Sequence, residues 1–454
     1  MTQPRFALPE TTAYALRNAR VPRAFLGGPA PEGAEADADG GVLLDITVEA
    51  GRIARLAGAG GGAPDCPAVD LAGRHAWPRL VDAHAHLDKG HSVARTPNPD
   101  GDFPGARDAT TEDRTRHWDA EDLRRRMAFG LACAEAHGVA AIRTHLDSQE
   151  GGPLRDQAAV TWAVFREMRA AWAGRVVLQG VGLTPIDAYA TPYGARLADL
   201  IAGSGGLLGG VTRPTGGLHG GALAEIDALL DALFRLAKAR DLDVDLHVDE
   251  TGDPAAASLD AVARATLRHG YEGRVTCGHC CSLAVQPPEV AAATIARVAR
   301  AGIRIITLPT VNMYLQDRAR GRTPRWRGTA PVQELLAAGV AVAMAGDNCR
   351  DAFYAYGDHD VLDTFRAGVR ILHLDHPLDR APALVGPVPA AIMGLPEAGT
   401  IRTGGPADLI LLPARSLNEV MARPHPDRIV LARGRRVAAA PPPYEALTGE
   451  VAPW

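Results

Sequence analysis

Short apolar runs alternate with amphipathic stretches along the central part of this chain. Spacers with helical periodicity separate most of the runs, as in residues 122–138 and 226–241. The runs are rich in apolar and β-branched residues and occupy residues 79–88, 139–147, 175–185, 207–212, 242–250, 274–280, 303–309 and 340–347. Eight strands with helical spacers are typical of a (β/α)8 barrel, and the alternative is a doubly wound sheet. The pattern therefore favours an α/β fold with a TIM-like barrel.

Both ends of the chain show a different pattern, in which short strands are joined by turns. Residues 42–58 predict a hairpin that turns at Gly51, and residues 398–414 and 427–438 return to short strands. We expect a small β-sandwich domain formed by both chain ends beside the barrel. The expected domain limits are 1–75, 76–392 and 393–454.

Composition excludes several classes of protein. Of the 454 residues, 46% are hydrophobic and 22% are charged, which supplies a large core and excludes a disordered chain. The formal net charge of −5 gives no attraction to nucleic acid, so no nucleic-acid partner is expected. No apolar run of about eighteen residues predicts a membrane span. The first residues lack a secretory pattern and the six cysteines form no disulfide framework, so a cytoplasmic location is expected.

Polar side chains unsuited to a hydrophobic core stand where four predicted strands end. They are His84 and His86 on the first strand, His247 and Glu250 on the fifth, His279 on the sixth, and Asp347 and Asn348 on the eighth. Alternation along a strand puts His84 and His86 on one face, where both can bind one ion. The carboxyl ends of barrel strands meet at one face, which carries the catalytic sites of this fold. The pattern therefore predicts one shared site.

Three imidazoles and one carboxylate suit a zinc or iron ion that keeps a position for water. Such an ion lowers the pKa of its water from about 15.7 towards about 7, which provides hydroxide at neutral pH. Glu250 lies three residues beyond His247, close enough to move protons without binding the ion. His279 and Asp347 can hold and deprotonate the water.

Short motifs at these strand ends resemble the amidohydrolase superfamily in its cytosine deaminase-like branch. They are HAHLDK (84–89), HVDE (247–250), GHC (278–280) and GD (346–347). The likeness covers nearly the whole chain from about residue 40, and its further segments are RTHLD (143–147), TLPTVNMYLQDR (307–318), RTPRWRG (322–328) and PADLILLP (406–413). The resemblance implies that one divalent ion, zinc or iron, is bound by His84, His86, His247 and Asp347. No bridging lysine stands in residues 207–212, so one metal ion is expected.

The resemblance also implies a reaction, the hydrolytic deamination of a cyclic amidine. Metal-activated hydroxide would attack the ring carbon that bears the amine, and Glu250 would protonate the adjacent ring nitrogen. His279 resembles the residue that orients the hydroxide. The expected partner is a small N-heterocyclic substrate, and a homo-oligomer is expected because this superfamily is commonly oligomeric.

Two positions depart from the pattern of cytosine deaminases. Asn348 stands where those enzymes carry a second aspartate, and residues 183–187 lack their pyrimidine-reading glutamine. The combination of Lys89 with Asn348 is similar to that of N-isopropylammelide amidohydrolases, which remove an alkylamine from an oxo-triazine. Pterin deaminases are a third related group. The substrate therefore stays open among these heterocycles.

Further candidate substrate contacts are aromatic or cationic. Phe353 and Trp326 can stack on a planar heterocycle, and each can equally be ordinary packing. Two interpretations are open for Arg322, Arg325 and Arg327: they bind a substrate with a carboxylated ring, or they belong to a solvated charged loop. Two other functions stay open as alternatives: a cyclic amide hydrolase, which usually needs two ions and a bridging lysine, and a non-catalytic paralogue, against which the complete ligand set argues.

Overall fold

The computed structural model describes residues 7–61, 65–150, 156–217, 219–221 and 223–448. The chain forms two compact units. The first comprises Met1–Asp82, Ala132–Ala141 and Asp360–Pro441, and the second comprises Ala83–Leu131, Ile142–His359 and Pro442–Trp454. The domain limits expected from the sequence stay a prediction. Within the described part of the chain, no helix is both long and apolar enough to cross a membrane.

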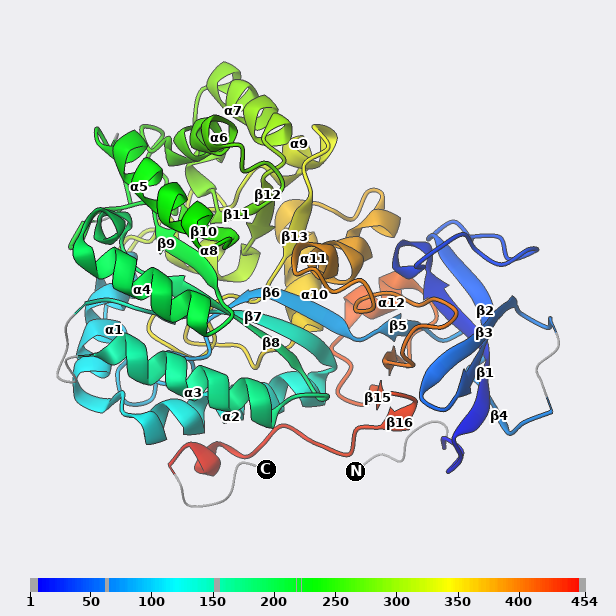
Figure 1. The fold of residues 1–454 in the computed structure, drawn as a ribbon. Helices are drawn as coiled ribbons and strands as arrows, with labels where there is room; N and C mark the ends of the chain where they lie inside the picture. Colours follow the sequence, from blue (N-terminus) through cyan, green and yellow to red (C-terminus); the bar gives the residue numbers. More distant parts are fainter. Residues whose placement is uncertain (1–6, 62–64, 151–155, 218, 222, 449–454) are drawn as a thin grey trace. The chain divides into compact units, whose positions relative to one another are not determined.

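The first unit contains a four-stranded sheet built from the start of the chain, in the order β3-β2-β1-β4 (Figure 1). Its strands are β1 (Ala13–Pro22), β2 (Gly41–Glu49), β3 (Arg52–Gly58) and β4 (Ala68–Asp70). β2 and β3 pair antiparallel and turn through Ala50 and Gly51, whose φ values are 49° and 81°. Both residues are left-handed, as a tight hairpin of this hand requires. The predicted hairpin is confirmed.

A second sheet of the first unit joins the two ends of the chain, in the order β16-β15-β14-β5. Its strands are β5 (Ala76–Pro78), β14 (Leu409–Leu411), β15 (Ile429–Ala432) and β16 (Arg435–Arg436). Trp77 of β5 is fully buried, and its ring packs at centroid distances of 5.0 Å from Phe25 and 5.6 Å from Phe365. The helices of this unit are η1 (Arg23–Phe25), α10 (Val361–Leu372), η4 (Leu378–Val385), α11 (Pro387–Ile392) and α12 (Leu417–Ala422).

Eight strands form a nearly closed barrel in the order β13-β12-β11-β10-β9-β8-β7-β6. They are β6 (Leu80–Ala85), β7 (Val139–Asp147), β8 (Val177–Leu183), β9 (Leu207–Val211), β10 (Val244–Val248), β11 (Val275–His279), β12 (Arg304–Thr307) and β13 (Val342–Met344). A parallel bridge between Ala85 and Asp347 joins the end of β6 to the segment after β13, the first and last strands of the barrel. The Asp347 amide donates to the His84 carbonyl at 2.8 Å. All eight strands predicted from the apolar runs are present, and the predicted barrel is confirmed.

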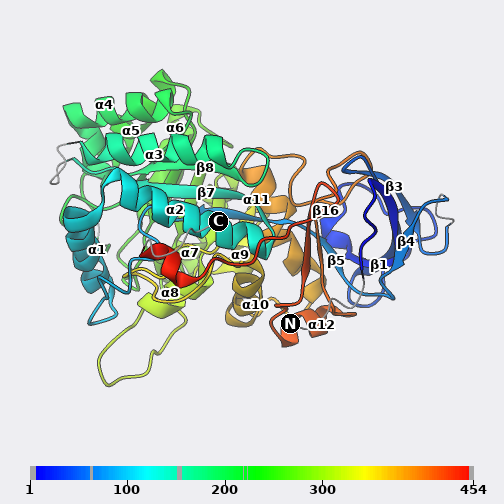
Figure 2. The same ribbon diagram turned by 90° about the horizontal axis from the view of Figure 1, so that it is seen from below.

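Helices follow most of the strands and surround them (Figures 1 and 2). They are α1 (Phe103–His117), α2 (Ala120–His137), α3 (Gln157–Ala171), η2 (Ile186–Ala190), α4 (Pro192–Gly203), α5 (Ile226–Ala239), α6 (Ser258–His269), η3 (Cys281–Ala284), α7 (Pro288–Arg300), α8 (Pro309–Leu315), α9 (Val332–Ala337) and η5 (Tyr444–Leu447). α5 buries Leu229, Leu230, Leu233, Phe234 and Ala237, the spacing of an amphipathic helix. This apolar stripe explains why the segment forms a helix against the sheet.

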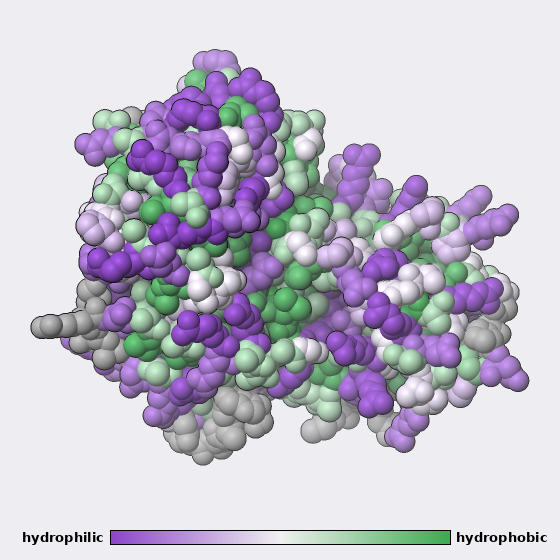
Figure 3. Space-filling model, viewed as in Figure 1, coloured by the Kyte–Doolittle hydropathy of each residue, from purple (hydrophilic) through white to green (hydrophobic). Residues whose placement is uncertain are grey.

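The outer face of α7 is exposed to solvent and mixes charged residues with small apolar ones and Val290. α7 buries Ile295 and Val298, whereas Glu289 and Arg300 are exposed. Figure 3 shows hydrophilic side chains predominating over α7 and its neighbours at the top of the view. The barrel helices therefore separate an apolar inner face from a solvated outer face, and the carboxyl ends of the strands remain as the place for chemistry.

Candidate active site

The carboxyl ends of the barrel strands bring together six side chains that are each at most 5% exposed. They are His84 and His86 from β6 and the residue just beyond it, His145 from β7, His247 from β10, His279 from β11, and Asp347 after β13. Alternation along β6 gives the two histidines that flank Ala85 the same face. The predicted convergence of the first, fifth, sixth and eighth strands is therefore present in the structure.

The donor atoms of this cluster are close enough for one ion. Asp347 Oδ1 lies 3.6 Å from His84 Nε2 and 3.2 Å from His86 Nε2, and His86 Nε2 lies 3.3 Å from His247 Nε2. A tetrahedral ion with bonds of about 2.0–2.2 Å needs donor atoms about 3.4 Å apart. The donor atoms of His84, His145 and His247 also lie within 4.8 Å of one another. These distances fit a single divalent ion.

The protonation state of the histidines fits the same ion. Burial lowers the pKa of His84 and of His86 well below the usual value, and the neighbouring imidazoles and Lys89 add to the effect. Burial also lowers the pKa of His247 in the same way. Neutral imidazoles are the form that binds a metal. Donor type, spacing and charge together make this cluster suitable for zinc or iron.

A carboxyl group and an imidazole lie close together beside the cluster. Glu250 Oε1 lies 3.4 Å from His279 Nδ1, and Asn312 Nδ2 lies 2.9 Å from the same nitrogen and 3.4 Å from Glu250 Oε1. With the amide of Asn312 as donor, His279 Nδ1 accepts, which leaves the ring proton on Nε2. Burial raises the pKa of Glu250 to about 8, and burial lowers the pKa of His279 to about 3. At neutral pH Glu250 is an acid and His279 is neutral.

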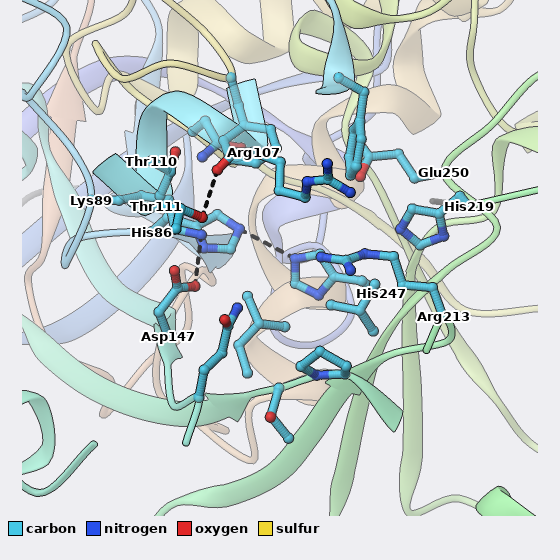
Figure 4. A pocket seen from close by; sticks show the side chains of 18 of the residues that line it. His86, Lys89, Arg107, Thr110, Thr111, Asp147, Arg213, His219, His247 and Glu250 are labelled. Atoms are coloured by element: carbon cyan, nitrogen blue, oxygen red, sulfur yellow. Dashed lines mark hydrogen bonds and ion pairs between the residues drawn. The ribbon is translucent and has the colours of Figure 1, made fainter. Parts of the chain in front are cut away.

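A cavity with about 610 Å3 of empty space opens in front of these groups (Figure 4). Its lining includes His86, His247, Glu250 and His279 on the side of the cluster. Its apolar and aromatic surface comes from Phe103, Leu183, Val211 and Phe353.

Cations surround the rest of the cavity. Lys89 Nζ pairs with Asp147 Oδ1 at 2.9 Å, and Arg114 pairs with Asp147 Oδ2 at 2.9 Å. Arg107 and Arg213 also line the cavity and point towards the same space in Figure 4. The Asp147 carboxylate thus forms ion pairs with two cations, and the guanidinium groups of Arg107 and Arg213 also face the cavity. The site favours a ligand rich in hydrogen-bond acceptors.

Three of the four predicted substrate contacts line this cavity: Lys89, Asn348 and Phe353. Lys89 Nζ lies 5.4 Å from the centroid of the Phe353 ring, and Asn348 donates to Asp351 at 2.7 Å. Trp326 does not line it. Its ring instead packs over Gly252, where an added Cβ would lie 2.8 Å from the indole.

The three arginines of the segment around Trp326 lie at the surface. Arg322, Arg325 and Arg327 are all exposed, and Arg322 forms an ion pair with Asp317. The structure therefore places them on a solvated charged loop. Of the two interpretations given by the sequence, contacts to a carboxylated ring or a solvated charged loop, this position corresponds to the loop.

Several residues of the site were not among the sequence candidates. His145-Leu146-Asp147 repeats, one strand later, the order His86-Leu87-Asp88, and this repetition was an available signal. The main-chain amide of Asp147 even donates to Asp88 Oδ2 at 2.6 Å. Asn312 and the cavity arginines come from helices and loops whose local sequence carries no such signal.

A (β/α)8 barrel with buried imidazole and carboxylate donors at its strand ends is an arrangement typical of metal-dependent hydrolases. This chain belongs to the amidohydrolase family, whose family model matches residues 104–438. The membership predicted from the strand-end motifs is confirmed.

Known proteins similar to the chain include two enzymes and one solved structure. Pterin deaminase of Rhizobium rhizogenes (strain K84) is 47% identical over 443 residues, which cover 97% of each chain. N-isopropylammelide isopropyl amidohydrolase of Pseudomonas sp. (strain ADP) is 27% identical over 353 residues, 76% of this chain and 81% of that one. The structure of 5-methylcytosine deaminase from Klebsiella pneumoniae with 5-fluorocytosine has a TM-score of 0.76 at 24% identity, covering 94% of this chain and 97% of that one. This last likeness supports the fold.

Proposed function

We propose that the protein is a hydrolytic deaminase of an amino-substituted, fused N-heterocycle of the pterin class. Its family and its similarity to a pterin deaminase over nearly the whole chain support this reaction type. The observation that carries the proposal is the buried Glu250–His279–Asn312 group, which lies beside the histidine cluster with Glu250 and His279 on the cavity wall. Such a group can deliver a proton next to a carbon under attack by water.

We assign the metal ligands to His84, His86, His247 and Asp347, as the resemblance implies. When bound, a zinc or iron ion supplies the Lewis acidity that activates water at neutral pH. His145 packs on His84 with ring centroids 4.0 Å apart and has Asp245 Oδ1 at 3.9 Å from its Nε2. We assign His145 a positioning role towards His84.

Glu250 and His279 supply the proton transfers in this proposal. Glu250 holds its proton at neutral pH because burial raises its pKa to about 8, so it can protonate the ring nitrogen next to the amine-bearing carbon. His279, neutral and held by Asn312, can orient the attacking water through its Nε2 side. The water oxygen bonds to the ring carbon and the carbon–nitrogen bond breaks. One proton of the water goes to the leaving amine, which departs as ammonia, and the other returns to Glu250, which gave its own proton to the ring nitrogen. The product is the corresponding oxo heterocycle.

The cavity supports a fused ring. Phe353 with Leu183 and Val211 supplies apolar surface against which a flat bicyclic system can pack. Lys89 and Arg213 can donate to ring oxygens and nitrogens. Lys89 and Asn348 both line the cavity, which keeps the oxo-triazine amine hydrolase as a second candidate.

The proposal is tested by amine release from the zinc-loaded or iron-loaded enzyme. The panel contains pterin, cytosine, isocytosine and N-isopropylammelide, with ammonia measured for the first three and isopropylamine for the last. We expect ammonia from pterin at the highest kcat/KM. Turnover of cytosine or of the triazine alone would contradict the pterin assignment, and the absence of turnover on the whole panel would contradict the deaminase itself.

A further inference from the structure

A second cluster of metal-binding side chains lies among residues that the proposed reaction does not use. His91, Cys349 and His359 each offer one donor atom, and these atoms lie within 4.8 Å of one another. The three residues are 7%, 3% and 7% exposed. His91 comes from the loop after β6, and the other two come from the segment after β13.

The imidazole of His91 is buried without polar contacts. Among the residues that the structure describes, neither of its ring nitrogens has a hydrogen-bond partner. An imidazole nitrogen in a protein interior normally has one, because an unmatched buried polar group costs roughly 1–3 kcal/mol. The ring of His91 lies beside that of His359, with the two centroids 5.3 Å apart.

The surrounding backbone is shaped to hold these side chains. Gly130 on α2 has no Cβ, and an added Cβ would lie 2.9 Å from His359 Nε2, so the glycine leaves room for the ring. His91 and His359 have φ values of 61° and 52°, a left-handed conformation that is uncommon for residues other than glycine. Such backbone persists where the surrounding structure imposes it, and it is frequent at ligand sites.

We propose that His91, Cys349 and His359 bind a second transition-metal ion, zinc, at a structural site separate from the histidine and carboxylate cluster of the active site. Two imidazole nitrogens and one thiolate sulfur form a ligand set that zinc accepts, with bonds of about 2.0–2.1 Å to nitrogen and about 2.3 Å to sulfur. On binding, the Cys349 thiol releases its proton to the solvent, a zinc–sulfur bond forms, and no electron is transferred. This proposal does not depend on the identity of the substrate.

The second ion would hold one wall of the active-site cavity. The His91 amide already donates to the Cys349 carbonyl at 3.0 Å, so the two segments lie side by side. Asp351, two residues beyond Cys349, accepts from Asn348 at 2.7 Å and from the Phe353 amide at 2.8 Å. Asn348 and Phe353 line the cavity. An ion at Cys349 would therefore fix the segment that presents both of these contacts.

The test counts ions in the full-length protein. The protein is dialysed against excess zinc, freed of unbound metal by gel filtration, and measured by inductively coupled plasma mass spectrometry. We expect two ions per wild-type chain and one in Cys349→Ser and in His91→Asn. Cys133→Ser is the matched control, because Cys133 is also a buried cysteine but lies outside the cluster, and it should keep two. One ion in the wild type, lost in His86→Ala, would overturn the proposal.

Cobalt substitution gives a second readout, the first part of which uses the wild-type protein alone. The ligands assigned to the active site are nitrogen and oxygen, so a thiolate-to-cobalt charge-transfer absorption reports only a site with a cysteine. We expect this band in the wild type and in Cys133→Ser, and its loss in Cys349→Ser. Wild-type protein without the band, or a band that survives in folded Cys349→Ser, would refute the second site.

Discussion

Replacement of Glu250 by glutamine separates proton delivery from the other functions of the site. The side chain keeps its shape and can keep its contacts with His279 and Asn312, at 3.4 Å in both cases. It loses the acidic proton, because an amide cannot transfer one near neutral pH. Burial raises the pKa of wild-type Glu250 to about 8, so at pH 7 the protonated form that the variant lacks is the main one.

The expected loss for Glu250→Gln follows from the size of general acid catalysis. A positioned acid contributes about 10²–10⁴ in rate, so kcat for ammonia release should fall by that factor, which corresponds to about 2.7–5.4 kcal/mol in the barrier. Metal content should be unchanged, because Glu250 is outside the assigned ligand set. Glu289→Gln, an exposed glutamate on α7, is the control and should be fully active. Full activity of metal-loaded Glu250→Gln would refute the assigned role.

Three further changes test other parts of the structure. His86→Ala should abolish deamination and remove the active-site ion, measured as a loss of one metal equivalent. Arg213→Gln removes a positive charge that lowers the pKa of Glu250, so the decline of kcat/KM at alkaline pH should move to higher pH. A decline at the same pH as in the wild type, or at a lower pH, would contradict this. Arg428→Gln breaks a partly buried, bidentate ion pair with Asp360, whose shorter contact is 2.6 Å, and should cost about 1.5–3 kcal/mol of unfolding free energy in urea titrations. Although burial opposes it, Arg428 holds the pKa of Asp360 below its usual range. The stabilisation by the ion pair should therefore be present at neutral pH and be lost as the pH falls below about 4. An equal cost of the substitution at acidic and neutral pH would exclude the ion pair as its source.

The sequence predicted the barrel because its strands are buried on both faces and therefore consist of nearly continuous apolar runs. It predicted the candidate metal cluster for a related reason. A histidine or aspartate that interrupts such a run stands out, as His247 and Asp347 do. The alternation of a strand then fixes which neighbours share a face, as for His84 and His86.

The rest of the site was harder to predict because it depends on segments without a fixed period. Asn312 reaches His279 from the short helix α8, and Arg213 reaches the cavity from the loop after β9. The direction of such side chains depends on tertiary packing, which a local pattern does not encode. Trp326 shows the converse case. It was a reasonable aromatic candidate from its sequence neighbours, yet its ring covers Gly252.

The hydrogen bond between the Asp347 amide and the His84 carbonyl has a consequence for how the protein matures. This bond closes the barrel between its first and last strands, and the same two residues belong to the proposed ligand set. A chain in which these strands have not met offers only part of the ligand set, so tight loading requires a completed barrel. An ion that binds only the completed form stabilises it by mass action. Tight metal binding would then occur only in chains whose barrel has closed, and it would stabilise that closed form. Amide hydrogen exchange at β6 and β13 should therefore slow selectively when the metal is added.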